Sequence, residues 1–122
     1  MSDLPHPVEL SDRVIDSGVA EPPHNRVIDA LTEVEDDVAI VESFSHCWAL
    51  RTDDGLVCVD SSGTGTGAEV VAALRGWSTD PVHTLVYTHG HLDHVGGSGA
   101  FVADAADRKH RRPTFVSHEA VP

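Results

Sequence analysis

The feature that most constrains this chain is the stretch "HGHLDH", which places His89, His91, Asp93 and His94 directly after the apolar run "LVY". That run is typical of a short buried strand. Because residues two apart point to the same side of an extended segment, we expect His89 and His91 to project together as a chelating pair. Asp93 and His94 are adjacent, so both can reach a metal only if the backbone turns there. Imidazole nitrogens with one carboxylate favour zinc, with iron or manganese as alternatives. A solvated loop that collects histidines by chance would not explain this economical spacing.

The stretch resembles the hallmark of the metallo-β-lactamase superfamily, H-x-H-x-D-H at the end of a strand, and matches it without a gap. The resemblance implies that His89 and His91 bind one metal ion and that Asp93 and His94 bind a second. A complete site would therefore hold two zinc ions. Asp93 is also expected to act in catalysis by helping to orient the attacking water.

Two residues outside the motif are further candidates. Asp60 closes the expected strand "LVCVD", where the family carries an aspartate that buttresses the metal site. An ordinary turn aspartate is the alternative interpretation. His118 follows the last expected strand, early for the next metal ligand of this family, so we place it at the substrate rim or else on ordinary surface.

The order of expected elements predicts an α/β (α+β) fold built in layers, with the ligands at the carboxyl ends of strands. "SSGTGTG" is interpreted as a tight strand-to-helix turn rather than a dinucleotide site, because no acidic residue ends the next strand. The stretch "NRVIDALTEV", from Asn25, is expected to form one or two helical turns. The remaining elements are expected as strands within 38–44, 46–52, 56–60, 82–88 and 114–117, and as helices over 68–77 and 98–111.

The expected organisation is an extended N-terminal arm over residues 1–24, which is rich in proline, followed by a domain over residues 25–122. The family resemblance spans this second segment and implies the first half of an αββα metallo-β-lactamase sandwich. It places further metal ligands beyond Pro122. We therefore expect a truncated half-domain whose metal site is incomplete by itself and whose uncovered sheet favours self-association.

Beyond the motif, "VESFSHCWALRTDDGLVCVDSSG" and "HEAVP" resemble the alkyl-sulfatase-like branch of the superfamily. This resemblance implies a zinc-dependent hydrolase that acts on a small-molecule substrate, such as a sulfate ester or another ester. A thioester, lactam, lactone or phosphodiester are other options. Two alternatives stay open: an inactive truncated remnant of such a hydrolase, and an iron-binding redox member of the same fold.

Charge limits the partners of the chain. Its 20 acidic and 8 basic residues give a formal net charge of −12, so we expect neither nucleic acid nor an anionic membrane as a partner. The start of the chain lacks the pattern of a signal peptide, which predicts a cytoplasmic protein. Cys47 and Cys58 flank an expected hairpin turn and are predicted to be free thiols, as a reducing compartment would leave them.

Overall fold

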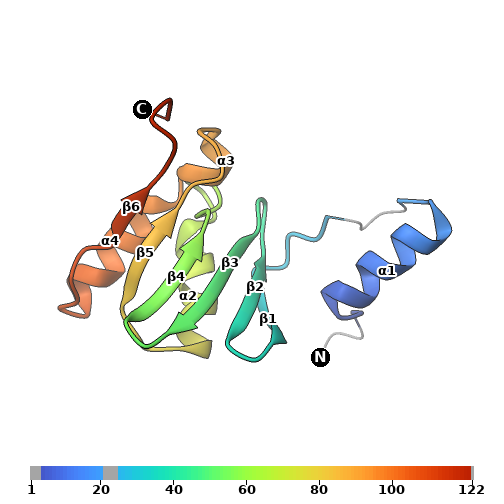
Figure 1. The fold of residues 1–122 in the computed structure, drawn as a ribbon, viewed down its shortest axis with the longest axis horizontal. Coiled ribbons are helices and arrows are strands. Elements are labelled where there is room, and N and C mark those ends of the chain that lie inside the picture. Colours follow the sequence, from blue (N-terminus) through green and yellow to red (C-terminus); the bar gives the residue numbers. More distant parts are fainter. Residues whose placement is uncertain (1–3, 21–24, 122) are drawn as a thin grey trace.

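The computed structural model describes residues 4–20 and 25–121, and its centre is a six-stranded sheet in the order β1-β2-β3-β4-β5-β6. The first four strands form an antiparallel meander, and β5 and β6 then add in parallel (Figure 1). Parallel neighbours need crossover connections, and each of these contains a helix. The strands are β1 (Ala30–Glu35), β2 (Val38–Glu42), β3 (Cys47–Thr52), β4 (Gly55–Val59), β5 (Val82–Val86) and β6 (Thr114–Val116).

Two helices cover one face of this sheet and close the core. Helix α2 (Gly67–Trp77) connects β4 to β5, and α4 (Ser98–Asp107) connects β5 to β6 after the single turn of α3 (Leu92–Val95). Both longer helices lie behind the sheet in Figure 1. This layered α/β architecture confirms the predicted fold class. Within the described residues, no helix is both long enough and apolar enough to span a membrane. The largest buried side chains of the core include Val41, Leu56, Val70, Leu74, Leu85 and Phe101.

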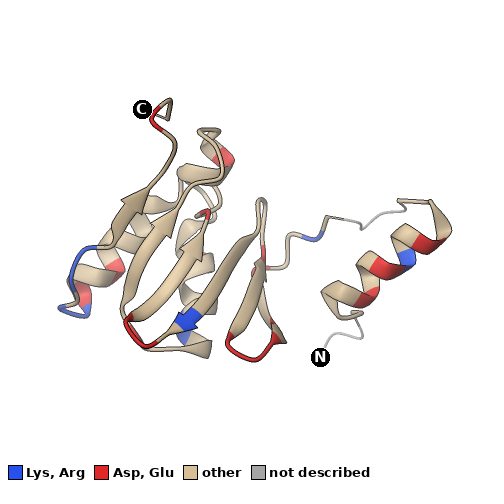
Figure 2. Cartoon of the chain, in the orientation of Figure 1, with Lys and Arg blue, Asp and Glu red and all other residues tan. Residues whose placement is uncertain are grey.

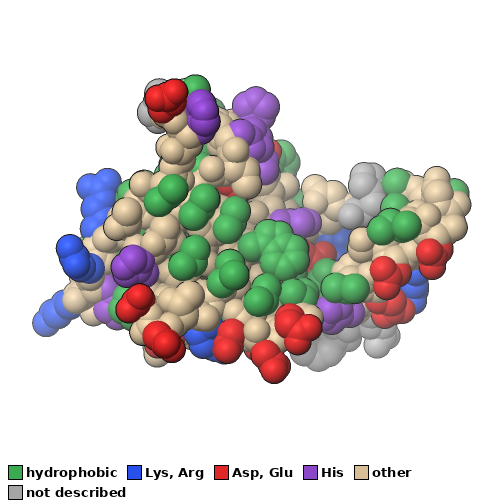
Figure 3. All heavy atoms as spheres, in the orientation of Figure 1, with side chains coloured by type: hydrophobic (Ala, Val, Ile, Leu, Met, Phe, Trp, Pro, Cys, Tyr) green, Lys and Arg blue, Asp and Glu red, His purple; other side chains and the backbone are tan. Residues whose placement is uncertain are grey.

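The opposite face of the sheet carries a row of apolar side chains that the two helices leave open. Trp48 pairs with Val59, Val59 with Val86, and Val86 with Val116, so the row crosses four neighbouring strands. Trp48 and Val116 are 39% and 46% exposed. Figure 3 shows this row as a band of hydrophobic side chains across the sheet.

The N-terminal segment is not the extended arm that the sequence analysis predicts. Residues Pro7–Ser17 form helix α1, while residues 1–3 and 21–24 lie outside the described part of the chain. The helix begins with Pro7, whose fixed φ suits a first turn, and the side chain of His6 accepts a hydrogen bond from the Val8 amide. It ends at Gly18, which adopts the left-handed conformation (φ 69°) of a helix C-cap.

The helical turns expected from Asn25 onward are also wrong, because residues Ala30–Glu35 form the edge strand β1. This strand pairs with β2 over its length, with Leu31 opposite Val41. Leu31 packs against the buried core from this position. Pairing with a neighbouring strand therefore outweighs the local preference of this segment for helical turns.

The two cysteines agree with their prediction, since both are buried free thiols. Cys58 lies opposite Ala49 in the β3–β4 pair, with Cys47 two residues away on the same face. The Cys58 thiol beside it, together with burial, raises the pKa of Cys47 well above its usual range. Both side chains act as small apolar parts of the core.

Candidate metal centre

The end of β5 brings three imidazole rings together. Residues 87–97, which we call the histidine loop, leave β5, form the single turn α3 and lead into α4. The ring of His89 lies 4.7 Å from that of His91 and 4.0 Å from that of His94, measured between centroids. In α3, the turn also brings a carboxylate oxygen of Asp93 within 3.4 Å of His94 Nε2. The structure thus gathers all four residues that the motif predicts as metal ligands.

Asp60 lies directly behind these rings, at the end of β4. Its side chain is buried, and its backbone adopts a left-handed conformation with φ 62°. Oδ2 accepts hydrogen bonds from His94 Nδ1 at 2.7 Å and from the Thr88 hydroxyl at 2.7 Å. Oδ1 accepts from the Thr88 backbone amide at 2.8 Å. A buried carboxylate needs such donors to offset its desolvation, and all three come from the histidine loop.

This hydrogen-bond chain assigns the protons of two imidazoles. His94 donates from Nδ1 to Asp60, which turns its Nε2 towards Ser45 Oγ and Asp93 Oδ2, at 3.3 and 3.4 Å. Because the Thr88 hydroxyl donates to Asp60, it accepts from Nδ1 of His89 at 2.9 Å. Both rings therefore direct Nδ1 to this hydrogen-bond chain and keep Nε2 as the nitrogen that a metal would use, so one buried carboxylate orients both of them.

A serine that the sequence analysis missed holds Asp93 from the other side. Ser45, in the loop between β2 and β3, donates from Oγ to Asp93 Oδ2 at 2.8 Å and lies 3.3 Å from His94 Nε2. This hydrogen bond lowers the pKa of Asp93, and the neighbouring His94 and His91 lower it further. Thr88 was also missed, although its position directly before His89 is a usable signal. Ser45 has no such signal, because it lies 48 residues before Asp93.

Glycines let the histidine loop lie against the turn that follows β4. A Cβ added to Gly67 would lie 2.6 Å from Gly97 Cα, and a Cβ on Gly97 would collide with the Ser61 carbonyl. Backbone hydrogen bonds join the two segments, from Ser61 N to His94 O (2.8 Å) and from Gly97 N to Ser62 O (3.0 Å). The glycine-rich stretch therefore brings Asp60 up to the histidine loop.

An open cavity of about 530 Å³ lies over these residues. The polar residues that line it include the predicted ligands Asp93 and His94 together with Asp60, Thr88 and Ser45. Phe44, His46, Trp48 and Val59 also line it.

The family model for the metallo-beta-lactamase superfamily matches residues 40–117, which include most of the sheet and the whole histidine loop. The chain belongs to this superfamily. The superfamily fold is hydrolase-like, and its members usually bind metal ions, often zinc.

Among curated superfamily relatives, the chain is 39% identical over 68 residues to the alpha subunit of 2,4-dinitroanisole O-demethylase from Nocardioides sp. (strain JS1661). It is 36% identical over 56 residues to a linear primary-alkylsulfatase from Pseudomonas sp. (strain ATCC 19151). These matches cover 54% and 45% of this chain. The chain spans only 21% and 11% of the length of the two relatives.

Solved structures of the superfamily share the fold. The stereoselective inverting sec-alkylsulfatase Pisa1 from Pseudomonas sp. matches with a TM-score of 0.54 and 25% identity, over 67% of this chain and 14% of its own. A subclass B3 metallo-beta-lactamase of Bradyrhizobium japonicum matches with a TM-score of 0.56 and 18% identity, over 76% of this chain and 35% of its own. The second likeness shows the fold alone.

The donor set fits the metal chemistry of the superfamily, although the side chains are not arranged around one point. Within residues 4–20 and 25–121, no group of three or more His, Cys, Asp or Glu side chains is arranged so that it could hold a metal ion. The chemistry of the donors nevertheless suits zinc, since three imidazoles and one carboxylate lie together and Asp60 fixes the protons of two rings.

His118 lies apart from the imidazole cluster, in the exposed turn that follows β6. Its Nδ1 accepts a hydrogen bond from the Ala120 amide at 3.1 Å. The same turn brings Val121 against the histidine loop, 3.5 Å from where a Cβ on Gly90 would lie. A role for His118 at the substrate rim stays a prediction.

Proposed function

We propose that this protein is a metal-dependent hydrolase of small-molecule esters, with zinc as the metal and a sulfate ester as the first substrate class. The observation that carries the proposal is the hydrogen-bond chain from Asp60, which holds Nδ1 of both His89 and His94 and keeps Nε2 of each ring as the possible metal ligand. Ring orientation by a buried carboxylate is typical of protein metal sites.

Each residue has a role in this proposal. His89 and His91 would hold one ion, and Asp93 and His94 a second. Bound zinc supplies Lewis acidity and lowers the pKa of a water molecule towards neutrality. Asp93, whose pKa is lowered mainly by the hydrogen bond from Ser45, stays a carboxylate and can accept a hydrogen bond from the attacking water.

The names of the relatives support two substrate classes. The alkylsulfatase relative supports a sulfate ester, and the 2,4-dinitroanisole O-demethylase relative supports an aryl methyl ether as the second candidate. The net charge of −12 favours a small molecule over a polyanion as the partner. Two free thiols favour a reducing compartment such as the cytoplasm.

The test combines metal binding with turnover. The product of the full reading frame that contains residues 1–122 is titrated with Zn²⁺, Mn²⁺ and Fe²⁺, then assayed on an alkyl sulfate, a thioester, a lactam and 2,4-dinitroanisole. We expect zinc binding that His91→Ala weakens, and zinc-dependent cleavage of the alkyl sulfate. Absence of metal-dependent turnover on all four substrates would refute the proposal.

A further inference from the structure

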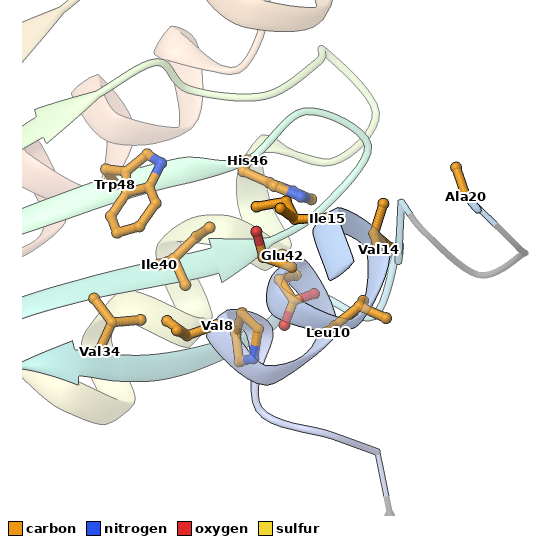
Figure 4. Close-up of a pocket in the computed structure, with 12 residues that line it drawn as sticks. Val8, Leu10, Val14, Ile15, Ala20, Val34, Ile40, Glu42, His46 and Trp48 are labelled. Atoms are coloured by element: carbon orange, nitrogen blue, oxygen red, sulfur yellow. The ribbon is translucent and has the colours of Figure 1, made fainter. Parts of the chain in front are cut away.

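A second cavity, of about 500 Å³, lies between helix α1 and the sheet. Figure 4 shows side chains from α1 on one side and from β1, β2 and β3 on the other. We call this cavity the α1 groove. Its volume lies within the range of about 300–1,000 Å³ that is usual for small-molecule sites. The apolar side chains that line it include Val8, Val14 and Ile15 from the helix and Val34, Ile40 and Trp48 from the strands.

Helix α1 lies over the sheet without packing tightly against it. No residue of α1 is buried, and Ile15 is 72% exposed although it lines the groove. The helix is held near its start, where Arg26 donates from Nη1 to the Pro5 carbonyl at 2.7 Å. The same arginine forms a buried ion pair with Glu42. The helix is thus anchored while its apolar side chains stay free to meet a ligand.

The groove carries no uncompensated charge towards its interior. Glu42 is the one charged residue that lines it among the described residues, and both of its oxygens are occupied by the guanidinium of Arg26, at 2.6 and 2.7 Å. The acidic residues of α1, coloured red in Figure 2, are not among the residues that line the groove. An uncharged, apolar occupant therefore suits the groove best.

The α1 groove adjoins the cavity over the histidine loop. His46 and Trp48 line both cavities, so the apolar groove borders the space that holds Asp93 and His94 at these two side chains. A molecule that fills both must have a polar group at one end and an apolar tail at the other.

We infer that the α1 groove binds the apolar tail of the substrate while its polar, reacting group lies at the histidine loop. The occupant is a single-tailed amphiphile, and Trp48 and Ile15 contribute to its selection by tail length. This inference rests on the proposed function, but the binding of the tail can be measured without turnover.

The experiment measures the binding of alkyl sulfonates with tails of four to twelve carbons, below their micellar concentrations. A sulfonate has a carbon–sulfur bond in place of the ester, so it is not hydrolysed. Trp77→Phe leaves Trp48 as the one tryptophan of the chain, and its emission reports occupancy of the groove. Binding is measured with chelator and with zinc. We expect affinity to rise by about twofold to fourfold per methylene in both conditions, the upper factor corresponding to about 0.8 kcal/mol per buried CH₂.

Three variants locate the tail. Ile15→Asp places a charge in the groove on a side chain that is already exposed, so the fold should tolerate it, and it should remove most of the dependence on tail length. Val19→Asp is the matched control, since Val19 is 51% exposed and does not line the groove. Val116→Asp tests the open sheet face instead. Both controls should keep the dependence on tail length.

The outcomes separate the two proposals. A dependence on tail length that Ile15→Asp removes, without metal-dependent turnover, would support the groove and refute the hydrolase. Turnover with no dependence on tail length would support the hydrolase and overturn the groove. A third outcome is loss of the dependence on tail length in Val116→Asp but not in Ile15→Asp. It would place the tail on the open sheet face, or would indicate that a second protein chain naturally covers that face. Either reading would overturn the inference.

Discussion

Asp60 Oδ2 lies 2.7 Å from Nδ1 of His94, and the two residues come from segments 34 positions apart. Asp60 reaches this position from a left-handed backbone (φ 62°), which costs on the order of 1 kcal/mol for a residue other than glycine. The hydrogen bonds from His94 and Thr88 offset that cost. The orientation of the imidazoles is therefore set by the end of β4 as much as by the loop that carries them.

Asp60→Asn should lower zinc affinity by about 10–100-fold, because an amide can no longer accept on both sides and would turn an NH₂ towards a donor. Asparagine tolerates the left-handed backbone, so the change isolates the carboxylate. Calorimetric titration with zinc measures the effect. Asp80→Asn, an exposed aspartate that flanks β5, is the control. Equal affinities of the two variants would contradict the role of Asp60.

His89→Ala should weaken zinc binding more than His118→Ala. The ring of His89 lies within 4.7 Å of two other imidazoles, whereas His118 hydrogen-bonds within its own exposed turn. The comparison requires two calorimetric titrations under the same buffer conditions. Equal losses would mean that His118 also binds the metal.

Gly97→Ala should destabilise the fold by about 2–3 kcal/mol, since its new Cβ collides with the Ser61 carbonyl and Gly67 lies against the same spot. Gly99→Ala, two residues later in α4, meets no atom within 4 Å and should stabilise by about 0.5 kcal/mol. Denaturant unfolding followed by circular dichroism gives both values. A similar effect of the two substitutions would contradict the close contact of Gly97 with Ser61 and Gly67.

Asp104 predicts a specific acid sensitivity. Burial would raise the pKa of this carboxyl, but hydrogen bonds from Arg75 and Arg108 outweigh it, and the pKa is lowered overall. Its stabilising contribution is thus complete above the unfolded value near 4 and is lost as pH falls through the lower folded value.

Asp104→Asn should therefore cost about 1–3 kcal/mol at pH 7, because it weakens a nearly buried pair with Arg75, and the difference from the parent protein should shrink below about pH 4. Urea titrations between pH 3 and 7 measure this trend. Asp107→Asn, on the exposed end of α4, should show no such trend. A constant difference across the range would contradict the assignment.

The sequence predicts the parts of this molecule that depend on local pattern. The motif from His89 to His94 specifies both its residues and its place after a strand, and the meander and α2 follow from apolar periodicity. Helix α1 had signals as well, Pro7 at its start and Gly18 at its end, but the surrounding prolines made an extended arm the simpler interpretation.

What the sequence does not predict depends on distant partners. Strand β1 forms because Leu31 finds Val41 across the sheet, and Ser45 meets Asp93 only after the meander has formed. The local residues of either segment do not encode these contacts. A single sequence offers no way to find them in advance.

The backbone hydrogen bonds between Ser61 and His94 and between Gly97 and Ser62 tie the histidine loop to the end of a core strand. Local unfolding of the loop would have to break these hydrogen bonds, which lie where Gly97 packs against Gly67. The loop and β4 should therefore open together as one cooperative unit. The amide protons of Ser61 and Gly97 should then exchange with deuterium as slowly as those of the central strands, with or without zinc. A metal ion would bind to a scaffold that is already ordered, and little of its binding free energy would be spent on folding the loop.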